Sequence, residues 1–520
     1  MRSVRSKVIA AALVLAAGGG VAAWQLLPAE GNGRGTAIRV GTSDVVSDLD
    51  PAGAYDAGSW ALFGNVYQSL LTVKPGSEAP VPDAASACRF IGGKLTTYQC
   101  ELRPDAKFSN GRAITAQDVK HSFDRIKKIN SEQGPAPLFN TLESVKAEGR
   151  TVTFNLSGRD ATFPFKIATG AASIVDREKY PAGALRRDGK VDGSGPYVLG
   201  AYTAGESAEL KPNPAYTGQA KPARTPVTVK YFADSVGLDR AWRDHRIEVA
   251  HRDMPPEVLA ALNPGLEDTR YQASGGTETR NLVFNVRPGS TTAKPAVRQA
   301  VAAVLDRSQL ASEVHHGTVT PLYSLVPAGV ASHSTPFFDT WPAPNTATAR
   351  KILKAAGVAT PVPISLGANE RGANLAEADA IAKQLTATGL FRVDVKAVAK
   401  WEDFQKRYAA GDFDAYTVGW IADFPDADNF LAPLVGAGST MNNGFSDKAV
   451  DALITRTQAH SDRGEAADDF RALQRIVAQQ VPMLPIWQKK DYVMSREAVT
   501  GAQYLSDGTG VWRLWDLDWL

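Results

Sequence analysis

The chain has 520 residues, long enough for two or three hydrophobic cores, since single cores stop growing at roughly 250 to 300 residues. Its 57 basic and 55 acidic residues nearly balance, and no long run of Lys or Arg occurs, which argues against a nucleic-acid partner. Apolar residues at 44% and charged residues at 22% are typical of a soluble protein.

The first 28 residues predict an export signal. Basic residues at positions 2, 5 and 7 precede Val8 to Leu27, a stretch without a charge. Cleavage after Ala23 or Ala29 would release the protein, whereas retention would leave it tethered to the membrane by one helix with its N-terminus in the cytoplasm. No Cys follows the apolar stretch, so a lipid anchor is excluded, and the Gly-rich residues 29–35 predict a flexible spacer.

The next elements predict a strand-rich first half. Residues 37–43 alternate as a short strand, and the apolar side chains from Trp60 to Leu71 recur at helical spacing. Thr115 is the expected N-cap of a helix, with Asp118 at its third position and Val119, Phe123 and Ile126 on its buried face. Further strands are expected at 152–156 and 227–232.

Cys88 and Cys100, the chain's two cysteines, flank a segment with Gly92 and Gly93 near its centre, which predicts a β-hairpin. Opposed residues of such a hairpin lie close enough for a disulfide, and an exported protein meets an oxidising compartment. We therefore expect a structural disulfide between them. The chain offers no CxxC or Cys/His cluster that would indicate a metal site.

From Pro295 onward, strands alternate with helices, which predicts an α/β fold with a mixed or parallel sheet and crossover helices. The expected helices and strands are a helix from Pro295 to Leu305, a helix at 346–356 that Gly357 ends, a strand at 362–366, a helix at 374–388, a strand at 391–398, a helix from Trp401, a strand at 416–420, and closing helices at 447–460 and 462–481.

The segment GWIADFPDADNF, Gly419 to Phe430, carries the most chemical information. It sets Asp423, Asp426 and Asp428, with Asp414 nearby, among aromatic residues. A carboxylate held against Trp420 and Phe424 is partly desolvated, so its attraction for a cation such as an ammonium group grows. The alternative is a solvated turn, in which Asp426 and Asp428 serve the turn structure.

Together with residues 102–126 (LRPDAKFSNGRAITAQDVKHSFDRI), GSGPY at 193–197 and PAVRQAVAAVLDR at 295–307, this segment resembles the extracytoplasmic solute-binding protein family 5. These are the receptors of peptide and nickel ABC importers, and the resemblance is to the dipeptide and oligopeptide type. It runs from about Thr36 to Leu520 in one unbroken order.

The resemblance implies a periplasmic-binding-protein-like α/β fold of class II, with two lobes joined by a two-segment hinge and an inserted α+β domain. Lobe I would comprise residues 36–73, 194–287 and 485–520, domain II residues 74–193, and lobe III residues 288–484. The two lobes would close over a ligand.

The implied function is the capture of short peptides by a monomer without a cofactor. The chain has no GxxxxGK[ST] loop and at most one spanning helix, so it would deliver its cargo to a separate permease with cytoplasmic ATPase subunits.

The family's motif places an Asp three residues after the Trp, where it takes the peptide's α-ammonium, and here that residue is Asp423. Gly419 and Ile421 would offer main-chain groups beside Trp420, and Ser59 and Trp60 resemble the lobe I segment that faces the peptide, although Trp60 is equally expected as core. Thr417 replaces the Arg that binds the carboxylate in some members, which leaves Arg371 and Arg280 as candidates.

Three other functions remain open. A nickel or metal-chelate receptor would use His residues, but the adjacent His315 and His316 are expected to form a capping or solvated pair. An exported hydrolase would need a motif such as GxSxG or HExxH, and neither is present, so we expect no enzyme. An adhesive surface protein gains support only from the possible membrane tether.

Overall fold

The computed structural model describes residues 36–74, 77, 79–506 and 511–520. The predicted export segment, residues 1–28, and the spacer, residues 29–35, lie outside the described residues. Within the described part, none of the helices combines the length and the apolar character that crossing a bilayer requires.

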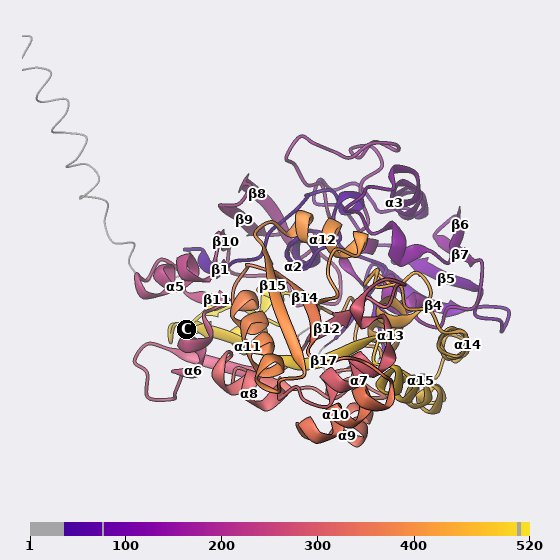
Figure 1. The fold of residues 1–520 in the computed structure, drawn as a ribbon. Helices are drawn as coiled ribbons and strands as arrows, with labels where there is room; N and C mark the ends of the chain where they lie inside the picture. Colours follow the sequence, from indigo (N-terminus) through magenta and orange to yellow (C-terminus); the bar gives the residue numbers. More distant parts are fainter. Residues whose placement is uncertain (1–35, 75–76, 78, 507–510) are drawn as a thin grey trace, which may run out of the picture. The chain divides into compact units, whose positions relative to one another are not determined.

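Eleven strands form one mixed sheet, which supplies the frame for most of the described chain (Figure 1). In spatial order the strands are β15 (Phe391–Val398), β14 (Val362–Asn369), β16 (Ala415–Trp420), β12 (Arg270–Phe284), β17 (Met483–Ser495), β11 (Val249–His251), β1 (Ile38–Thr42), β10 (Val227–Tyr231), β9 (Ser207–Pro212) and β8 (Tyr197–Thr203), with β13 (Val319–Pro321) paired to β17.

The long antiparallel strands β12 and β17 connect the two halves of this sheet. At one end, Arg270 pairs with Ser495 and β17 also pairs with β11; at the other end, Val283 pairs with Met483 and β12 also pairs with β16. The register shifts between Gly275 and Thr279, where three residues of β12 face one residue of β17. Such a bulge bends a strand locally. We propose that the hinge lies here.

Helices cover the sheet, and their order confirms the predicted alternation. β14, β15 and β16 are mutually parallel, and α11 packs against β14 and β15 as a crossover helix. The α-helices are α2 (Ala57–Val66), α3 (Ala116–Ile129), α4 (Phe163–Lys166), α5 (Ser235–Arg243), α6 (Pro256–Ala260), α7 (Pro295–Ala302), α8 (Arg307–Glu313), α9 (Pro336–Thr340), α10 (Thr346–Ala355), α11 (Asn374–Ala387), α12 (Trp401–Ala410), α13 (Asp428–Val435), α14 (Lys448–Thr457) and α15 (Ala467–Gln480).

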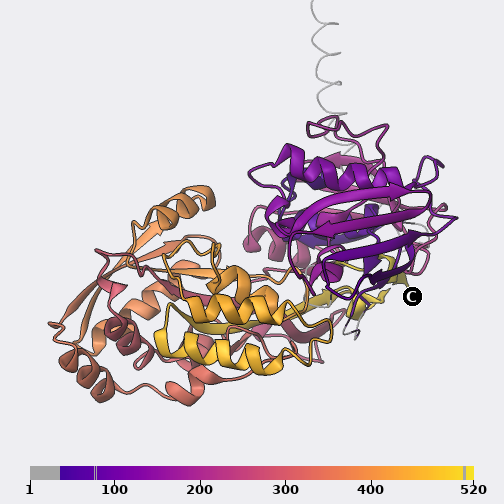
Figure 2. The ribbon, with the colours of Figure 1, turned by 90° about the vertical axis from the view of Figure 1, so that its right-hand side faces the viewer.

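A smaller antiparallel sheet carries the disulfide (Figure 2). Its strands, in spatial order, are β4 (Ala85–Phe90), β5 (Thr97–Leu102), β7 (Thr151–Leu156) and β6 (Leu142–Glu148). Cys88 and Cys100 face each other across β4 and β5 and are bonded, so the predicted hairpin and disulfide are confirmed. Two short pairs, β2 (Leu71–Thr72) with β3 (Val81–Pro82) and β18 (Val499–Thr500) with β19 (Asp518–Trp519), complete the described strands.

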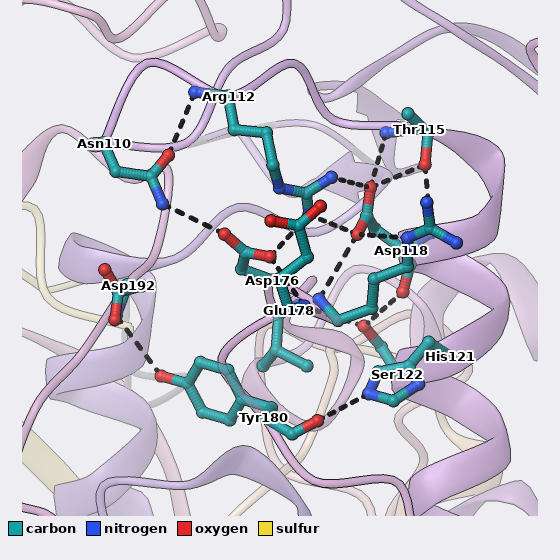
Figure 3. A network of polar contacts seen from close by, with 12 residues as sticks. Asn110, Arg112, Thr115, Asp118, His121, Ser122, Asp176, Glu178, Tyr180 and Asp192 are labelled. Carbon is teal, nitrogen blue, oxygen red and sulfur yellow. Dashed lines mark hydrogen bonds and ion pairs between the residues drawn. The ribbon is translucent and has the colours of Figure 1, made fainter.

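Helix α3 begins with the predicted capping box, in which Thr115 and Asp118 each accept a hydrogen bond from the other's backbone N–H. Asp118 also forms an ion pair with Arg112, as does Asp176 (Figure 3). Both carboxylates are fully buried, and burying them is tolerable only because this cation pairs with them. The network holds the segment around Asp176 against α3.

A second buried ion pair joins α3 to lobe I. The Arg125 guanidinium donates two hydrogen bonds to Asp50, at 3.0 and 2.6 Å, and both side chains are almost fully buried. Removing one partner of such a pair leaves an uncompensated buried charge, which typically costs about 3 to 5 kcal/mol. Helix α3 is therefore fixed to the segment that contains Asp50.

The helix around Trp60 is shorter than the apolar spacing predicts. It ends at Val66, where Tyr67 turns to an extended backbone, and Leu71 enters strand β2. The Val66 carbonyl accepts a hydrogen bond from the N–H of Gly195 in the GSGPY segment, and a Cβ on Gly193 would lie only 2.0 Å from that carbonyl oxygen. Close packing against these glycines takes the place of a further helical turn.

We propose the division into lobe I, domain II and lobe III that the resemblance implies, with the boundary between lobes I and III moved to the bulge, so that residues 279–287 and 485–488 join lobe III; we use these names below. One hydrophobic cluster then contains residues of lobe I and domain II together with Phe424, a second contains residues of lobe III, and a third contains residues of lobe I.

The disulfide should stabilise domain II. Its closed loop spans a sequence separation of 12, and loops of this length are expected to stabilise by about 3 kcal/mol through the unfolded state. The Cys88→Ser/Cys100→Ser variant should therefore unfold at a lower urea concentration than the oxidised wild type. Reduced wild type should match the variant, and equal midpoints for the oxidised and reduced wild type would refute the expectation.

Candidate functional site

The carboxyl ends of strands from both lobes point towards the hinge. In lobe III, β16 ends at Trp420 opposite Thr279, next to the bulge of β12. In lobe I, β11 runs antiparallel to β17 and ends at His251, which lies opposite Val493. Lys489, the residue of β17 at the bulge, precedes Val493 by four residues. Ligand sites of α/β sheets lie beyond the carboxyl ends of strands. The loops that follow these strands are therefore the candidate site.

Asp423 lies three residues beyond β16, and contacts from two directions fix its carboxylate. The Tyr55 hydroxyl donates to Oδ2 at 2.7 Å, and the Asn429 amide donates to the same oxygen at 2.8 Å. The Asn429 side-chain oxygen accepts from the Asp423 backbone N–H at 2.8 Å. Among the described residues, none donates a hydrogen bond to Oδ1. The carboxylate is therefore oriented, and one of its oxygens is available.

The environment of Asp423 disfavours its charge. Burial raises the pKa of its carboxyl to about 6, although the hydrogen bonds from Asn429 and Tyr55 and the more distant charge of Lys166 work in the opposite direction. Burial and the neighbouring carboxylate also raise the pKa of the Tyr55 hydroxyl, which remains a donor. Lys166 itself is committed to Asp160, at 2.7 Å. The site thus has room electrostatically for a further cation.

The two aromatic residues predicted to surround this acid have different environments. The Phe424 ring stacks on Phe165 of domain II, with ring centroids 5.7 Å apart. The Trp420 indole Nε1 is buried and makes no hydrogen bond to any residue that the structure describes. A buried N–H without an acceptor is costly. A ligand carbonyl would satisfy it.

The other three acids have structural partners or stand apart. Asp414 lies at the opposite end of β16 and accepts hydrogen bonds from Ser290 and Ser365, so it does not belong with Asp423. Asp426 forms an ion pair with Arg463 at 2.7 Å, as expected of a turn acid. Asp428 is buried at the start of α13, and burial together with Asp426 raises its pKa to about 6.

Ser59 and Trp60, the lobe I candidates, are occupied by local contacts. The Ser59 hydroxyl donates to Asp56 at 2.8 Å in the first turn of α2, and its side chain is fully buried. The Trp60 indole N–H donates to the Ala54 carbonyl at 3.3 Å, and its ring packs over Gly170. Tyr55, which packs on Trp60 with ring centroids 5.3 Å apart, reaches Asp423 instead.

The two Arg candidates differ in how far they are committed. Arg371 follows β14 by two residues; it donates to the Ser43 carbonyl of lobe I at 2.9 Å and lies 3.6 Å from Asp253. Arg280 is buried, and its charge is matched by Glu377 at 2.8 Å, with a further hydrogen bond to Thr417. A second carboxylate at Arg280 would have to compete with Glu377.

The expectation that His315 and His316 form a capping or solvated pair is wrong for His315. Its ring is buried, and Nε2 lies 2.9 Å from Glu377, which also accepts from Arg280 and the Trp487 indole. Burial would raise the pKa of Glu377, but these neighbours lower it to about 2. His315 is thus part of the buried polar cluster around Glu377 in lobe III. In the part of the chain that the structure describes, no group of three His, Cys, Asp or Glu side chains could hold a metal ion.

Sequence reasoning included Tyr55 in the 55–60 segment that resembles the peptide-facing part of lobe I, but selected Ser59 and Trp60 from it, and it missed Asn429. Tyr55 is 368 positions from Asp423, and no local pattern reveals such a contact. Asn429 could have been found, because Asn six residues beyond an acid in a turn-forming segment is placed to hydrogen-bond back to it.

The comparisons with known proteins identify the family. The model of the bacterial extracellular solute-binding proteins, family 5 Middle, matches residues 79–442. The chain therefore belongs to the bacterial extracellular solute-binding proteins, family 5. This family consists of binding proteins rather than enzymes, and it serves peptide and nickel ABC importers, so the recognised family, the expected fold and the absence of catalysis are confirmed.

Three proteins illustrate what the chain is similar to. The dipeptide-binding protein of Pseudomonas aeruginosa is 28% identical over 493 residues, which cover 86% of this chain and 87% of that protein. The periplasmic binding protein DppA from Helicobacter pylori, in complex with the peptide STSA, matches with a TM-score of 0.79 and 20% identity, over 94% of this chain and 99% of that one. NikA from Staphylococcus aureus, in complex with Ni(L-His)₂, matches with a TM-score of 0.74 and 18% identity, over 90% and 96%.

The raised pKa of Asp423 predicts that this acid destabilises the ligand-free protein. Because the folded-state pKa is about 6 and the unfolded value is 3.8, the stability contribution of the carboxyl is complete below pH 4 and is lost as the pH rises through 6. Asp423→Asn should therefore exceed the wild type in unfolding free energy by about 1 to 3 kcal/mol at pH 8 and by much less at pH 4.

Urea unfolding at pH 4, 6 and 8 measures this difference. Asp412→Asn is the matched control, since this acid pairs with Arg407 while 44% exposed and should contribute little at any pH. An Asp423→Asn variant that is less stable than the wild type at pH 8 would contradict the assignment of an electrostatic cost to Asp423.

Proposed function

We propose that this protein is an extracytoplasmic receptor for short peptides, which it captures between lobes I and III and delivers to an ABC permease. The observation that carries the proposal is the Asp423 carboxylate, half-buried and oriented by Tyr55 and Asn429, with Oδ1 accepting from no described residue. The names of the dipeptide-binding relatives support the choice of ligand.

An α-ammonium satisfies this site in both charge and geometry. It brings a positive charge to a carboxylate whose ionisation burial disfavours, and its N–H groups can donate to Oδ1. Binding would lower the pKa of Asp423 and keep it ionised at neutral pH. Since every unmodified peptide has this group at its N-terminus, the contact recognises peptides without reading their sequence.

The peptide's main chain would meet the end of β16. Gly419 and Ile421 flank Trp420 there and would supply backbone donors and acceptors, as in the addition of a strand to a sheet. The buried Trp420 N–H would donate to a ligand carbonyl. Ser59 and Trp60 would contribute through the position of Tyr55, on which Trp60 packs.

Closure of the lobes brings Tyr55 and Arg371 into place. Tyr55 of lobe I reaches Asp423 of lobe III, and Arg371 of lobe III reaches the Ser43 carbonyl of lobe I. Both hydrogen bonds would break when the lobes separate. We propose Arg371 as a partner of the ligand at this boundary and give Arg280 a lesser role, because Glu377 already neutralises it.

Asp423→Ala should abolish most peptide binding. Loss of a carboxylate that partners a buried ammonium costs about 2 to 5 kcal/mol, so the affinity for Ala-Ala should fall by at least thirtyfold. Isothermal titration calorimetry measures this, with Asp412→Asn as the control that retains affinity. Unchanged binding by Asp423→Ala would refute the site, even if peptides bind elsewhere.

Thermal unfolding with added ligands separates the peptide receptor from a metal-chelate receptor. Peptides that bind the native state should raise its melting temperature by mass action. If nickel with histidine raises the melting temperature and dipeptides and tripeptides do not, the peptide proposal is wrong.

Tyr55→Phe should weaken peptide binding by about ten- to a hundredfold, since one hydrogen bond to a charged group is lost. The loss should appear mainly as faster dissociation, because Tyr55 meets Asp423 only when the lobes are closed. Stopped-flow tryptophan fluorescence measures both rates. Tyr202→Phe in β8 is the control; a change confined to the association rate would contradict the closing role of Tyr55.

A further inference from the structure

A charged hollow lies beside the bulge between β12 and β17. Its volume is about 460 Å³, counting the part that is open to solvent. The residues that line it are Arg252, Asp253, Met254, Leu259, Gly276, Thr277, Glu278, Lys489, Lys490, Asp491 and Tyr492.

The charged hollow and the Asp423 site adjoin. Thr279, immediately after the bulge, pairs with Trp420. A Cβ placed on Gly419 would lie 3.9 Å from the Glu278 carboxylate oxygen Oε1, so the end of β16 faces the wall of the hollow. A ligand that extends from Asp423 along β16 would therefore reach this hollow.

The acids of the hollow have partners of their own. Lys489 lies 2.7 Å from Asp253 and 3.4 Å from Glu278, and His251 lies 2.8 Å from Asp491. The charge of Lys489 holds the pKa of Asp253 below its usual value. These carboxylates do not depend on Arg252 for a hydrogen bond.

Arg252 is a cation of the hollow whose guanidinium N–H groups donate to none of the described residues. Its side chain is only 12% exposed, yet its nearest acid is Asp44, at 3.5 Å, and it donates no hydrogen bond to any residue that the structure describes. Burial opposes its charge, but Asp44 and Glu278 raise its pKa, so it remains a cation. A nearly buried guanidinium normally donates hydrogen bonds from several of its five N–H groups.

The backbone presents Arg252 to the hollow in an unusual way. Arg252 and Asp253 both adopt left-handed conformations, with φ of 65° and 55°, directly after β11. Non-glycine residues in this region are uncommon and concentrate at binding sites, where the surrounding structure maintains them. Two such residues in succession turn the chain sharply at the carboxyl end of β11.

We propose that Arg252 binds a carboxylate of the ligand inside the charged hollow, an inference that rests on the proposed peptide function. A guanidinium matches a carboxylate with two parallel N–H···O bonds, which Lys cannot form. Asp423 would hold the positive end of a peptide and Arg252 a negative group further along it. The carboxylate is either the C-terminus or an acidic side chain.

Calorimetry with Ala-Ala and its C-terminal amide tests the proposal. The wild type should prefer the acid by at least tenfold, and Arg252→Gln should remove that preference by weakening only the acid. If Arg252→Gln keeps the wild-type ratio of acid to amide affinities, Arg252 does not bind the terminal carboxylate.

The amide of Ala-Asp distinguishes the two sources of the carboxylate. If the side chain occupies the hollow, this amide should bind the wild type more tightly than Ala-Ala amide does, and Arg252→Gln should abolish the difference. Loss of the acid preference for Ala-Ala identifies the terminal carboxylate instead. Either result supports the proposal, and an effect on neither ligand refutes it.

Three controls separate this inference from folding and from the proposed function. Arg243→Gln removes an exposed Arg on α5 of the same lobe and should leave both affinities unchanged. Arg252→Lys keeps the charge without the fork and should recover only part of the acid preference. Asp423→Asn should weaken acid and amide equally, so a wild type that binds neither peptide defeats the proposed function. An Arg252→Gln variant that changes neither the Ala-Ala ratio nor the affinity for Ala-Asp amide defeats only the role of Arg252.

Discussion

The pairing of β12 with β17 is the constraint on which the rest of the structure depends. In the proposed division these two strands belong to both lobes, so the chain passes twice between the lobes, and the register shift at Gly276 to Glu278 lies at this crossing. The strands of each lobe point their carboxyl ends at this place. Side chains that are hundreds of residues apart in sequence, such as Tyr55 and Asp423, meet there as a result.

Two desolvated acids in this protein, the buried Glu377 and the half-buried Asp423, show opposite solutions to the same electrostatic problem. Glu377 is surrounded by Arg280, His315 and Trp487, which keep it ionised and leave nothing for a ligand. Asp423 has only neutral donors, which orient its carboxylate without neutralising it. The first arrangement serves the fold. The second leaves a charge that a ligand can complete, at some cost to the stability of the empty protein.

Local chemistry made much of the fold predictable. The capping box of Thr115 and Asp118 and the disulfide of Cys88 and Cys100 depend on residues close in sequence, and the periodic elements from β14 to β16 follow from hydrophobic spacing. Trp60 and His315 could not be resolved in this way, because burial next to Gly170 or Glu377 depends on tertiary packing. The motif around Trp420 selected Asp423, but the role of Arg252 needed the bulge, the hollow and the left-handed backbone together.

The stacked rings of Phe165 and Phe424 affect the balance between the open and closed conformations proposed for the ligand-free protein. Domain II is fixed to lobe I through Arg125 and Asp50, so separation of lobe III would pull the two rings apart and wet both faces. An aromatic pair of this kind is worth about 0.5 to 1.5 kcal/mol beyond its burial, which multiplies the closed population by roughly two to ten. The ligand-free protein would therefore already favour the enclosing conformation to this extent, before any solute binds.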